Sequence, residues 1–371
     1  MVSAPCFALC PSTVHKVLSG RLGVSWFFKI EMRREALNYV VCPKCAGELS
    51  VSGDTPEAME DGHFLSGALV CSGCSSKFTI RNGVPILLPA NLATVKLETA
   101  SRFAEEWTRW SDLRDYYEQE FFDWVAPLTP RDFANQLVFE GGCGKGRHTA
   151  IVAELGAKAI VSLDLGESAF VAFAHTRHFL NAHVVIGDLL DPPVRPIFDL
   201  AFSVGVLHHL PDPAAGFASL ASRARDGGRV AFWVYGQEGN EWITRYVDPV
   251  RKAVTSRMPA HFLRIACIPP AVALWAVIKL FYRPGANGKG PSNLPYGDYF
   301  AAQYHYPFDE IHANVFDQLV TPVAYYLRED EVRPWLASGF RDAEIRSHRG
   351  YSWTGLATVN RSKAAAAESH G

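Results

Sequence analysis

From residue 136 onward, short apolar segments alternate with helical patterns, and this alternation restricts the fold more than any other feature of the chain. Five segments have the length and composition of a buried strand: QLVFE, AIVSLD, HVVIGD, FDLAFSV and RVAFWVY. Helical spacing of apolar residues separates them, and the first helical segment ends before Gly156. The sequence therefore predicts an α/β fold, a doubly wound parallel sheet with helices on both faces.

The first turn from strand to helix is rich in glycine. The stretch VFEGGCGKGRHT, residues 138–149, places four glycines within six positions. Without side chains, the backbone N–H groups and the start of the helix can approach a ligand closely, and ligands of such sheets bind at this edge. A dinucleotide site would need G-x-G-x-x-G, but Arg147 stands where its last glycine belongs. The acid Glu140 before the glycines also favours a cationic ligand over a pyrophosphate.

Acidic residues end the next two strands. Asp164 follows Gly146 by 18 residues, where a carboxylate can accept hydrogen bonds from both hydroxyls of a ribose, and Asp188 stands where an adenine edge can be bound. Either acid alone is more often a helix cap or a turn residue. Three strand ends in order favour a nucleoside-containing cofactor.

With these motifs, residues 136–235 resemble a class I S-adenosylmethionine-dependent methyltransferase of the type 11-like group. The resemblance implies a Rossmann-like sheet, S-adenosylmethionine as cofactor, and a segment FDLAFSVGVLHHLPDP that lines the sulfonium side. The cofactor-binding residues that it implies are Glu140, Gly142, Gly144, Gly146, Asp164, Asp188, Leu189 and Ser203. The sequence departs from the common form at Gly141, Lys145 and Arg147, which we expect to alter affinity rather than to prevent binding.

A histidine pair follows the fourth strand. Methyl transfer mainly needs an acceptor held in line, but an oxygen or nitrogen acceptor can also need a base, and histidine is the usual candidate. The resemblance places His208 and His209 beside the reactive methyl group. His208 is the candidate catalytic base, whereas His209 more often has a packing role.

Two C-x-x-C pairs near the N-terminus are typical of a metal site. Cys42 and Cys45 are separated by 25 residues from Cys71 and Cys74, and four thiolates suit a tetrahedral zinc ion. The alternative is two unrelated turns with buried thiols. The stretch from residue 38 to residue 90, including NGVPILLP, resembles the Trm112-like zinc ribbons. A zinc ion with four cysteine ligands has no open position, so we expect a structural zinc, and paired cysteines indicate a reducing compartment.

Between Tyr235 and Thr321 the strand pattern stops for 85 residues, and the sequence predicts a mostly helical insertion that forms a substrate lid. An uncharged stretch from Ile265 to Ile278 is shorter than the roughly 18 residues of a membrane span. Its favoured interpretation is a helix buried against the lid core; the alternative is peripheral contact with a membrane or lipid through residues 265–282.

Two aromatic groups allow two interpretations each. Phe103, Trp107 and Trp110 lie on one face of a predicted helix, a pattern more typical of packing than of a ligand site. The end of the insertion holds six side chains that either line a polar substrate pocket or lie on the surface: Tyr299, Tyr304, His305, Tyr306, His312 and Asp317.

The predicted organisation has seven parts. They are an N-terminal extension without fixed structure (1–37), the zinc ribbon (38–90), a helical linker (91–130), the cofactor-binding domain (131–235), the lid (236–320), the C-terminal part of the methyltransferase domain (321–362) and a tail without fixed structure (363–371).

The net charge of -2 and the pI of about 6.7 give no overall attraction to nucleic acid. The sequence therefore predicts a cytoplasmic methyltransferase, with a peripheral contact at the inner membrane as a variant. It predicts a small-molecule acceptor, including a glycan- or lipid-linked one, methylated on oxygen or nitrogen, and no nucleic-acid partner. The alternatives are an rRNA base methyltransferase that recognises its substrate through the zinc ribbon, and a non-catalytic partner protein of the same fold.

Overall fold

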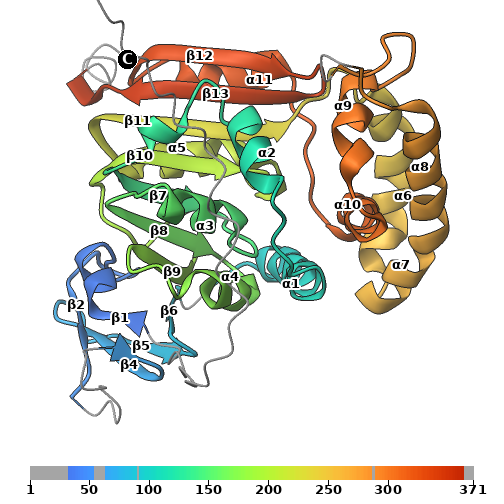
Figure 1. Ribbon diagram of the computed structural model, residues 1–371. Coiled ribbons are helices and arrows are strands. Elements are labelled where there is room, and N and C mark those ends of the chain that lie inside the picture. The colour runs from blue at the N-terminus through green and yellow to red at the C-terminus, as the bar shows by residue number, and fades with distance from the viewer. Residues whose placement is uncertain (1–31, 54–62, 90–91, 286–288, 363–371) are drawn as a thin grey trace, which may run out of the picture.

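The structure is a computed structural model that describes residues 32–53, 63–89, 92–285 and 289–362 (Figure 1). Most of the predicted extension and the whole predicted tail lie outside the described residues. Residues 32–37 belong to the predicted extension, but they form β1 (Met32–Arg33) and the start of a 3-10 helix (Arg34–Asn38). β1 pairs with β3 (His63–Phe64).

Seven strands form the expected sheet. They are β7 (Leu137–Gly141), β8 (Ala159–Asp164), β9 (Ala182–Gly187), β10 (Phe198–Val204), β11 (Ala224–Tyr235), β12 (Phe340–His348) and β13 (Ser352–Val359). The order is β12-β13-β11-β10-β7-β8-β9, parallel from β9 to β11 and antiparallel at β13. The predicted doubly wound sheet is confirmed, and its order changes direction between β7 and β10, where ligands of such sheets bind.

Helices cover both faces of this sheet. One face carries α2 (Tyr117–Trp124) and α3 (Arg147–Glu154), whose apolar residues pack on Val138, Ile160 and Phe202. The other face carries α5 (Pro213–Arg223), which packs on residues such as Phe139. The remaining helices of this part are α1 (Thr94–Arg109), α4 (Ser168–Thr176) and α11 (Glu329–Val332).

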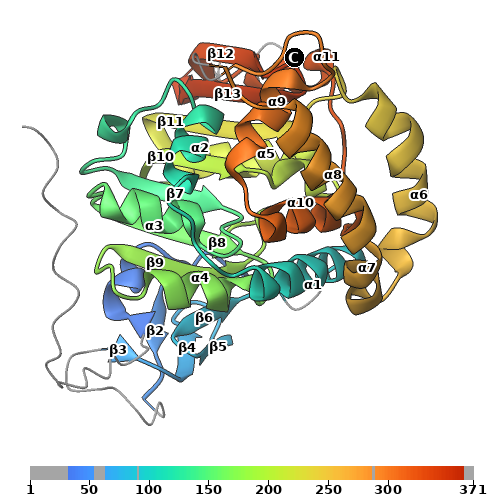
Figure 2. The same cartoon turned by 45° about the vertical axis from the view of Figure 1, so that its right-hand side comes forward.

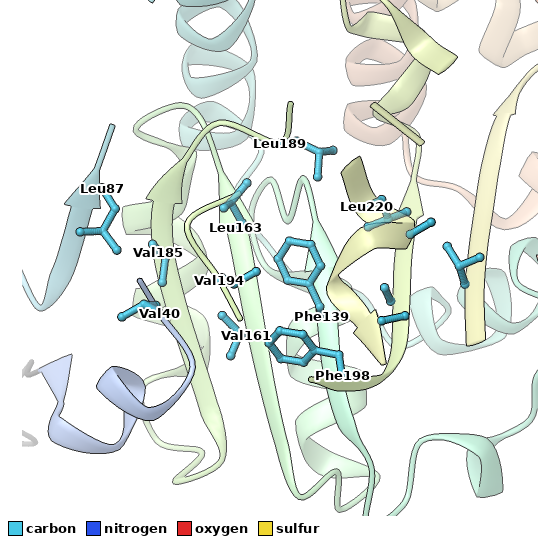
Figure 3. Packing of buried hydrophobic residues seen from close by; sticks show 14 of the residues in the cluster. Val40, Leu87, Phe139, Val161, Leu163, Val185, Leu189, Val194, Phe198 and Leu220 are labelled. Carbon is cyan, nitrogen blue, oxygen red and sulfur yellow. The ribbon is translucent and has the colours of Figure 1, made fainter. Parts of the chain in front are cut away.

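The ribbon continues the same sheet. Its strands β2 (Leu49–Val51), β4 (Gly67–Cys71), β5 (Lys77–Arg81) and β6 (Val84–Leu87) pair in antiparallel fashion, and β6 then pairs in parallel with β9. The result is one sheet of eleven strands. The apolar core is shared as well, because Val40 and Leu87 of the ribbon belong to the same buried cluster as Val161 and Val185 (Figure 3).

The insertion after β11 is helical, as predicted. It contains α6 (Asp248–Ala253), α7 (Ala260–Ala266), α8 (Ile268–Phe281), α9 (Gly297–Ala302) and α10 (Phe308–Val320). The central helix α10 packs against α1, α6, α7 and α8 (Figure 2).

The uncharged stretch Ile265–Ile278 is divided between α7 and α8. Ala271 and Ile278 are buried against the lid, as the favoured interpretation expects, but Ile265, Ile268 and Val272 are exposed. Among the described residues no single helix is long and apolar enough to cross a membrane. α7 and α8 pass that test only together, by length and composition, and they are bent by 42° where they meet.

Candidate active site and metal centre

The glycine turn brings three structural elements into close contact. Gly142 has φ +84°, and a Cβ atom there would lie 2.3 Å from Cγ2 of Val206 after β10. Gly146 has φ +82°, and a Cβ atom there would lie 2.7 Å from the Cα of Ala172 in α4. The turn therefore needs glycine for tight packing as well as for its left-handed backbone. Position 141 needs glycine for similar packing, since a Cβ atom there would lie 2.6 Å from Cδ1 of Leu189.

Glu140 lies below the turn and is buried. Its Oε2 accepts hydrogen bonds from Thr149 and, at 2.8 Å, from Ser162, while its Oε1 has no hydrogen-bond partner among the described residues and lies 3.5 Å from Nδ1 of His148. Glu140 does not line the cavity described below. Its observed contacts support the turn from inside the protein, and its predicted contact with the cofactor stays a prediction.

Asp164 organises the loop that faces the cavity. Its Oδ2 accepts a hydrogen bond from the backbone N–H of Gly144 at 2.8 Å, and its Oδ1 accepts from the N–H of Gly166 at 3.0 Å and from the hydroxyl of Ser168 at 2.8 Å. Each carboxylate oxygen can accept more than one hydrogen bond. Asp164 therefore still has capacity for ribose hydroxyls.

Asp188 forms an ion pair that the sequence did not reveal. Its Oδ2 lies 2.6 Å from Nζ of Lys96 in α1, and its Oδ1 accepts a hydrogen bond from the N–H of Leu190. Leu189 beside it lines the cavity, whereas Ser203 is fully buried and donates to the carbonyl of Gly141. The lysine fixes α1 over the edge of the sheet.

The two cations of the glycine turn hold the linker over the site. Lys145 is buried and donates hydrogen bonds to the carbonyls of Trp110 and Asp112 and to the hydroxyl of Tyr117; burial lowers the pKa of its ammonium group to about 8. The guanidinium of Arg147 lies over the rings of Trp107, Tyr117 and Trp124. Lys145 and Arg147, the two residues that depart from the usual motif, thus anchor α1 and α2.

A large cavity opens between the carboxyl ends of the strands, α1 and the lid. Its volume is about 1390 Å³, above the roughly 300–1,000 Å³ of ordinary ligand pockets. Of the predicted cofactor residues, it is lined by Gly142, Gly144, Asp164, Asp188 and Leu189; Glu140, Gly146 and Ser203 lie behind its wall. The cavity has room for a cofactor and an acceptor side by side.

Aromatic side chains from both the linker and the lid line the cavity. Phe103, Trp107 and Trp110, for which packing was the favoured interpretation, all line it. Of the six residues at the end of the insertion, Tyr299, His305, Tyr306 and Asp317 line it, whereas Tyr304 and His312 do not.

Four carboxyl groups in this cavity have raised pKa values, and one of them is Asp164, whose pKa is raised by burial. Burial raises the pKa of Asp317 to about 6, against a hydrogen bond from the hydroxyl of Tyr235 at 3.1 Å. Burial also raises the pKa of Glu120 to about 7, and that of Glu106 well above its ordinary value. Sequence reasoning missed Glu106 and Glu120, because each acid lies within an ordinary helical pattern.

His208 is not brought to the cavity. It is fully buried under the ring of Tyr235, whose centroid lies 3.9 Å away, and burial holds its pKa well below the ordinary value. His209 lines the cavity, but burial lowers its pKa to about 4. A catalytic role of His208 therefore finds no support in this geometry and stays a prediction.

The four predicted zinc ligands converge. The sulfur atoms of Cys42, Cys45, Cys71 and Cys74 all lie within 4.8 Å of one another. The Cys42–Cys74 and Cys45–Cys71 pairs are 3.6 and 3.5 Å apart, close to the spacing of about 3.8 Å that zinc–sulfur bonds of about 2.3 Å give in a tetrahedron. The donor set fits a structural zinc ion.

Comparison with known proteins agrees with both parts of this description. Residues 139–232 match the methyltransferase domain family, and residues 33–83 match the Trm112p-like protein family. The chain is therefore similar to methyltransferases over its cofactor-binding part and to Trm112p-like proteins over its ribbon. The predicted cofactors, S-adenosylmethionine and structural zinc, agree with the two matches.

The curated relatives have a common name. The chain is 33% identical to the tRNA U34 carboxymethyltransferase of Campylobacter hominis over 103 residues, 27% of this chain and 36% of the relative. It is 30% identical to that of Mannheimia succiniciproducens over 121 residues, 32% of this chain and 36% of the relative. The chain thus spans little more than a third of the length of these relatives.

Among solved structures, a magnesium protoporphyrin IX methyltransferase from Synechocystis with bound SAH has a TM-score of 0.41 and 15% identity, and the alignment covers 70% of this chain and 95% of that chain.

These relatives correct two predictions. A small-molecule acceptor and the absence of a nucleic-acid partner are both contradicted, because the relatives are named for a modification of tRNA. A net charge of -2 is an average over the chain, and a local basic surface is compatible with it. The cytoplasmic location stays a prediction.

Proposed function

We propose that the protein is an S-adenosylmethionine-dependent methyltransferase that modifies a base of an RNA, with tRNA as the substrate class. The observation that carries this proposal is the match to tRNA U34 carboxymethyltransferases from several bacteria. Because the chain spans only part of these relatives, both the RNA substrate and the transferred group belong to the proposal.

The cavity supports this function by its size and lining. Enzymes that modify a base take it out of the stack and hold it between aromatic side chains. Trp107, Tyr299 and Tyr306 line a space large enough for such a base beside a cofactor. The loop held by Asp164 and the carboxylate of Asp188 would bind the cofactor, which supplies an electrophilic methyl group when bound.

The chain's own contribution is to orient the acceptor, exclude water and accept a proton. Asp317 suits the last task better than either histidine, since its pKa of about 6 lies near neutrality and its side chain lines the cavity. Tyr235 orients this carboxyl group through its hydroxyl.

The test is transfer of a labelled methyl group from S-adenosylmethionine to separated tRNA and rRNA fractions, followed by mass spectrometry of the nucleosides. We expect a base with one added methyl group in the tRNA fraction, which the product mass identifies. Label only in rRNA would favour the rRNA alternative. Binding of the cofactor without transfer to either RNA would contradict the proposal.

A further inference from the structure

The outer side of the lid is apolar to an extent seen nowhere else in the described residues. The described residues include sixteen large hydrophobic side chains that are exposed, and eleven of these lie between residues 242 and 281. Three of them, Trp242, Tyr246 and Val250, also line the cavity. The other eight do not, and we call these eight the lid face: Val254, Phe262, Ile265, Ile268, Val272, Val277, Leu280 and Phe281. Patches of this kind usually mark an interaction site.

Helix α8 shows why the lid face needs a cover. Its inner side packs Ala271 and Ile278 into the lid, while its outer side exposes Val272, Leu280 and Phe281 at 48%, 73% and 60%. A helix that is apolar on both sides belongs either in a core or in contact with a membrane. α8 and α7 lie on the side of the lid away from the sheet (Figure 1), so the core of this chain does not cover them.

The charge of this segment is one-sided. Residues 249–297 contain seven lysines and arginines and no aspartate or glutamate, although the whole chain has 38 acids against 36 such bases. Arg257 and Arg283 are exposed, and within the described residues neither forms an ion pair. Lys252 is also exposed and forms an ion pair with Asp248.

We propose that the lid face is a docking surface for an anionic lipid membrane, on which α7 and α8 lie in the interface. Apolar side chains enter the boundary between headgroups and acyl chains while the surrounding cations contact anionic headgroups. The 42° bend between α7 and α8 and their joint length suit a pair lying flat, since neither helix alone could span. An RNA backbone would use the cations but leave the exposed leucine and phenylalanine in water.

This surface does not depend on the identity of the methyl acceptor, and it can be tested without an activity assay. The full-length, zinc-loaded protein is sedimented with vesicles of phosphatidylcholine mixed with phosphatidylglycerol, and with vesicles of phosphatidylcholine alone. We expect binding to the anionic vesicles and far weaker binding to the neutral ones.

Matched variants identify the surface. Leu280→Ser with Phe281→Ser is expected to lower partitioning at least about tenfold, whereas the control Leu180→Ser, which removes a side chain 77% exposed outside the lid, leaves it unchanged. Arg257→Gln with Arg283→Gln should weaken binding to anionic vesicles, and Arg131→Gln with Lys158→Gln should not. Circular dichroism confirms that each variant is folded.

Several outcomes would overturn the proposal. One is no sedimentation with anionic vesicles; another is an equal loss in the Leu180 control. Binding that vanishes in salt but ignores Leu280 and Phe281 would indicate a merely electrostatic surface, and tRNA competition at this face would assign it to RNA. A dimer in analytical ultracentrifugation that the Leu280 and Phe281 change dissociates, without vesicle binding, would assign it to a second copy.

Discussion

At the scale of single residues, the sequence located the edge of the site but not its interior. Gly142, Asp164 and Asp188 follow strands whose pattern is local, so their convergence at one edge of the sheet was predictable. Glu106 and Lys96 come from a helix whose position depends on contacts distant in the sequence. No local pattern could place them there.

The first prediction concerns two glycines that share a left-handed backbone. Gly146→Ala and Gly156→Ala should each cost about 1–2 kcal/mol for φ near +80°. Gly146→Ala should cost a further ~1–3 kcal/mol from overpacking against Ala172, because no atom lies within 4 Å of a Cβ at Gly156. Urea unfolding measures the difference, and equal losses would contradict the close packing of turn and α4.

The second prediction concerns Asp317 and pH. Because burial raises its pKa from 3.8 to about 6, the unfolded chain ionises first, and stability falls as the pH rises through this window. Asp317→Asn should therefore be about 3 kcal/mol more stable than the wild type near neutral pH and no different below the ordinary pKa. If Asp317 accepts the proton, this variant also loses transfer activity.

Asp123 provides the control for that measurement. Burial would raise its pKa, but hydrogen bonds and charge from His348 and Arg349 hold the pKa below the ordinary value. Asp123→Asn should therefore lose stability at neutral pH, the opposite sign. Thermal unfolding across a pH series compares both variants, and a change of the same sign in both would contradict the assignment.

At the scale of elements, periodicity predicted the strands from β7 to β11, the break in their alternation predicted the insertion, and the paired cysteines predicted the ribbon. It did not predict that β6 pairs with β9, because that contact joins Ile86 to Ile186. A pairing of two short strands that lie so far apart in the sequence produces no pattern that the sequence alone reveals. The uncharged sequence of α8 likewise does not show which of its side chains other parts of the chain cover.

The third prediction uses this pairing. Removal of zinc by a chelator, or Cys45→Ser, should unfold the ribbon, since small zinc domains depend on their metal. β9 would then lose a neighbour and become an edge strand, so amide exchange in residues 182–187 should rise while residues 159–164 in β8 stay protected. Exchange measured by mass spectrometry decides; unchanged protection of β9 would show that the pairing does not depend on the metal.

At the scale of the whole molecule, ribbon and methyltransferase share a sheet and a buried core. Two parts with separate cores would unfold independently, whereas shared packing couples them. The lid is different, because its own clusters around α7, α8 and α10 are separate from that core.

The fourth prediction follows from this coupling. The zinc-loaded protein should lose ribbon and sheet in one calorimetric transition, with any earlier, smaller transition confined to the lid. Proteolysis during heating identifies the part that opens first. A ribbon that melts alone while the sheet persists would contradict the shared core.

The pairing of β6 with β9 also bears on synthesis of the chain. The ribbon, residues 32–87, leaves the ribosome well before Ala182–Gly187 have been made, and domains generally begin to fold as they emerge. Until β9 arrives, the outer edge of β6 has unpaired backbone groups that another nascent chain can join. β6 is only four residues long and contains Pro85, which donates no hydrogen bond. A short strand that contains a proline limits such unwanted pairing until β9 has been synthesised.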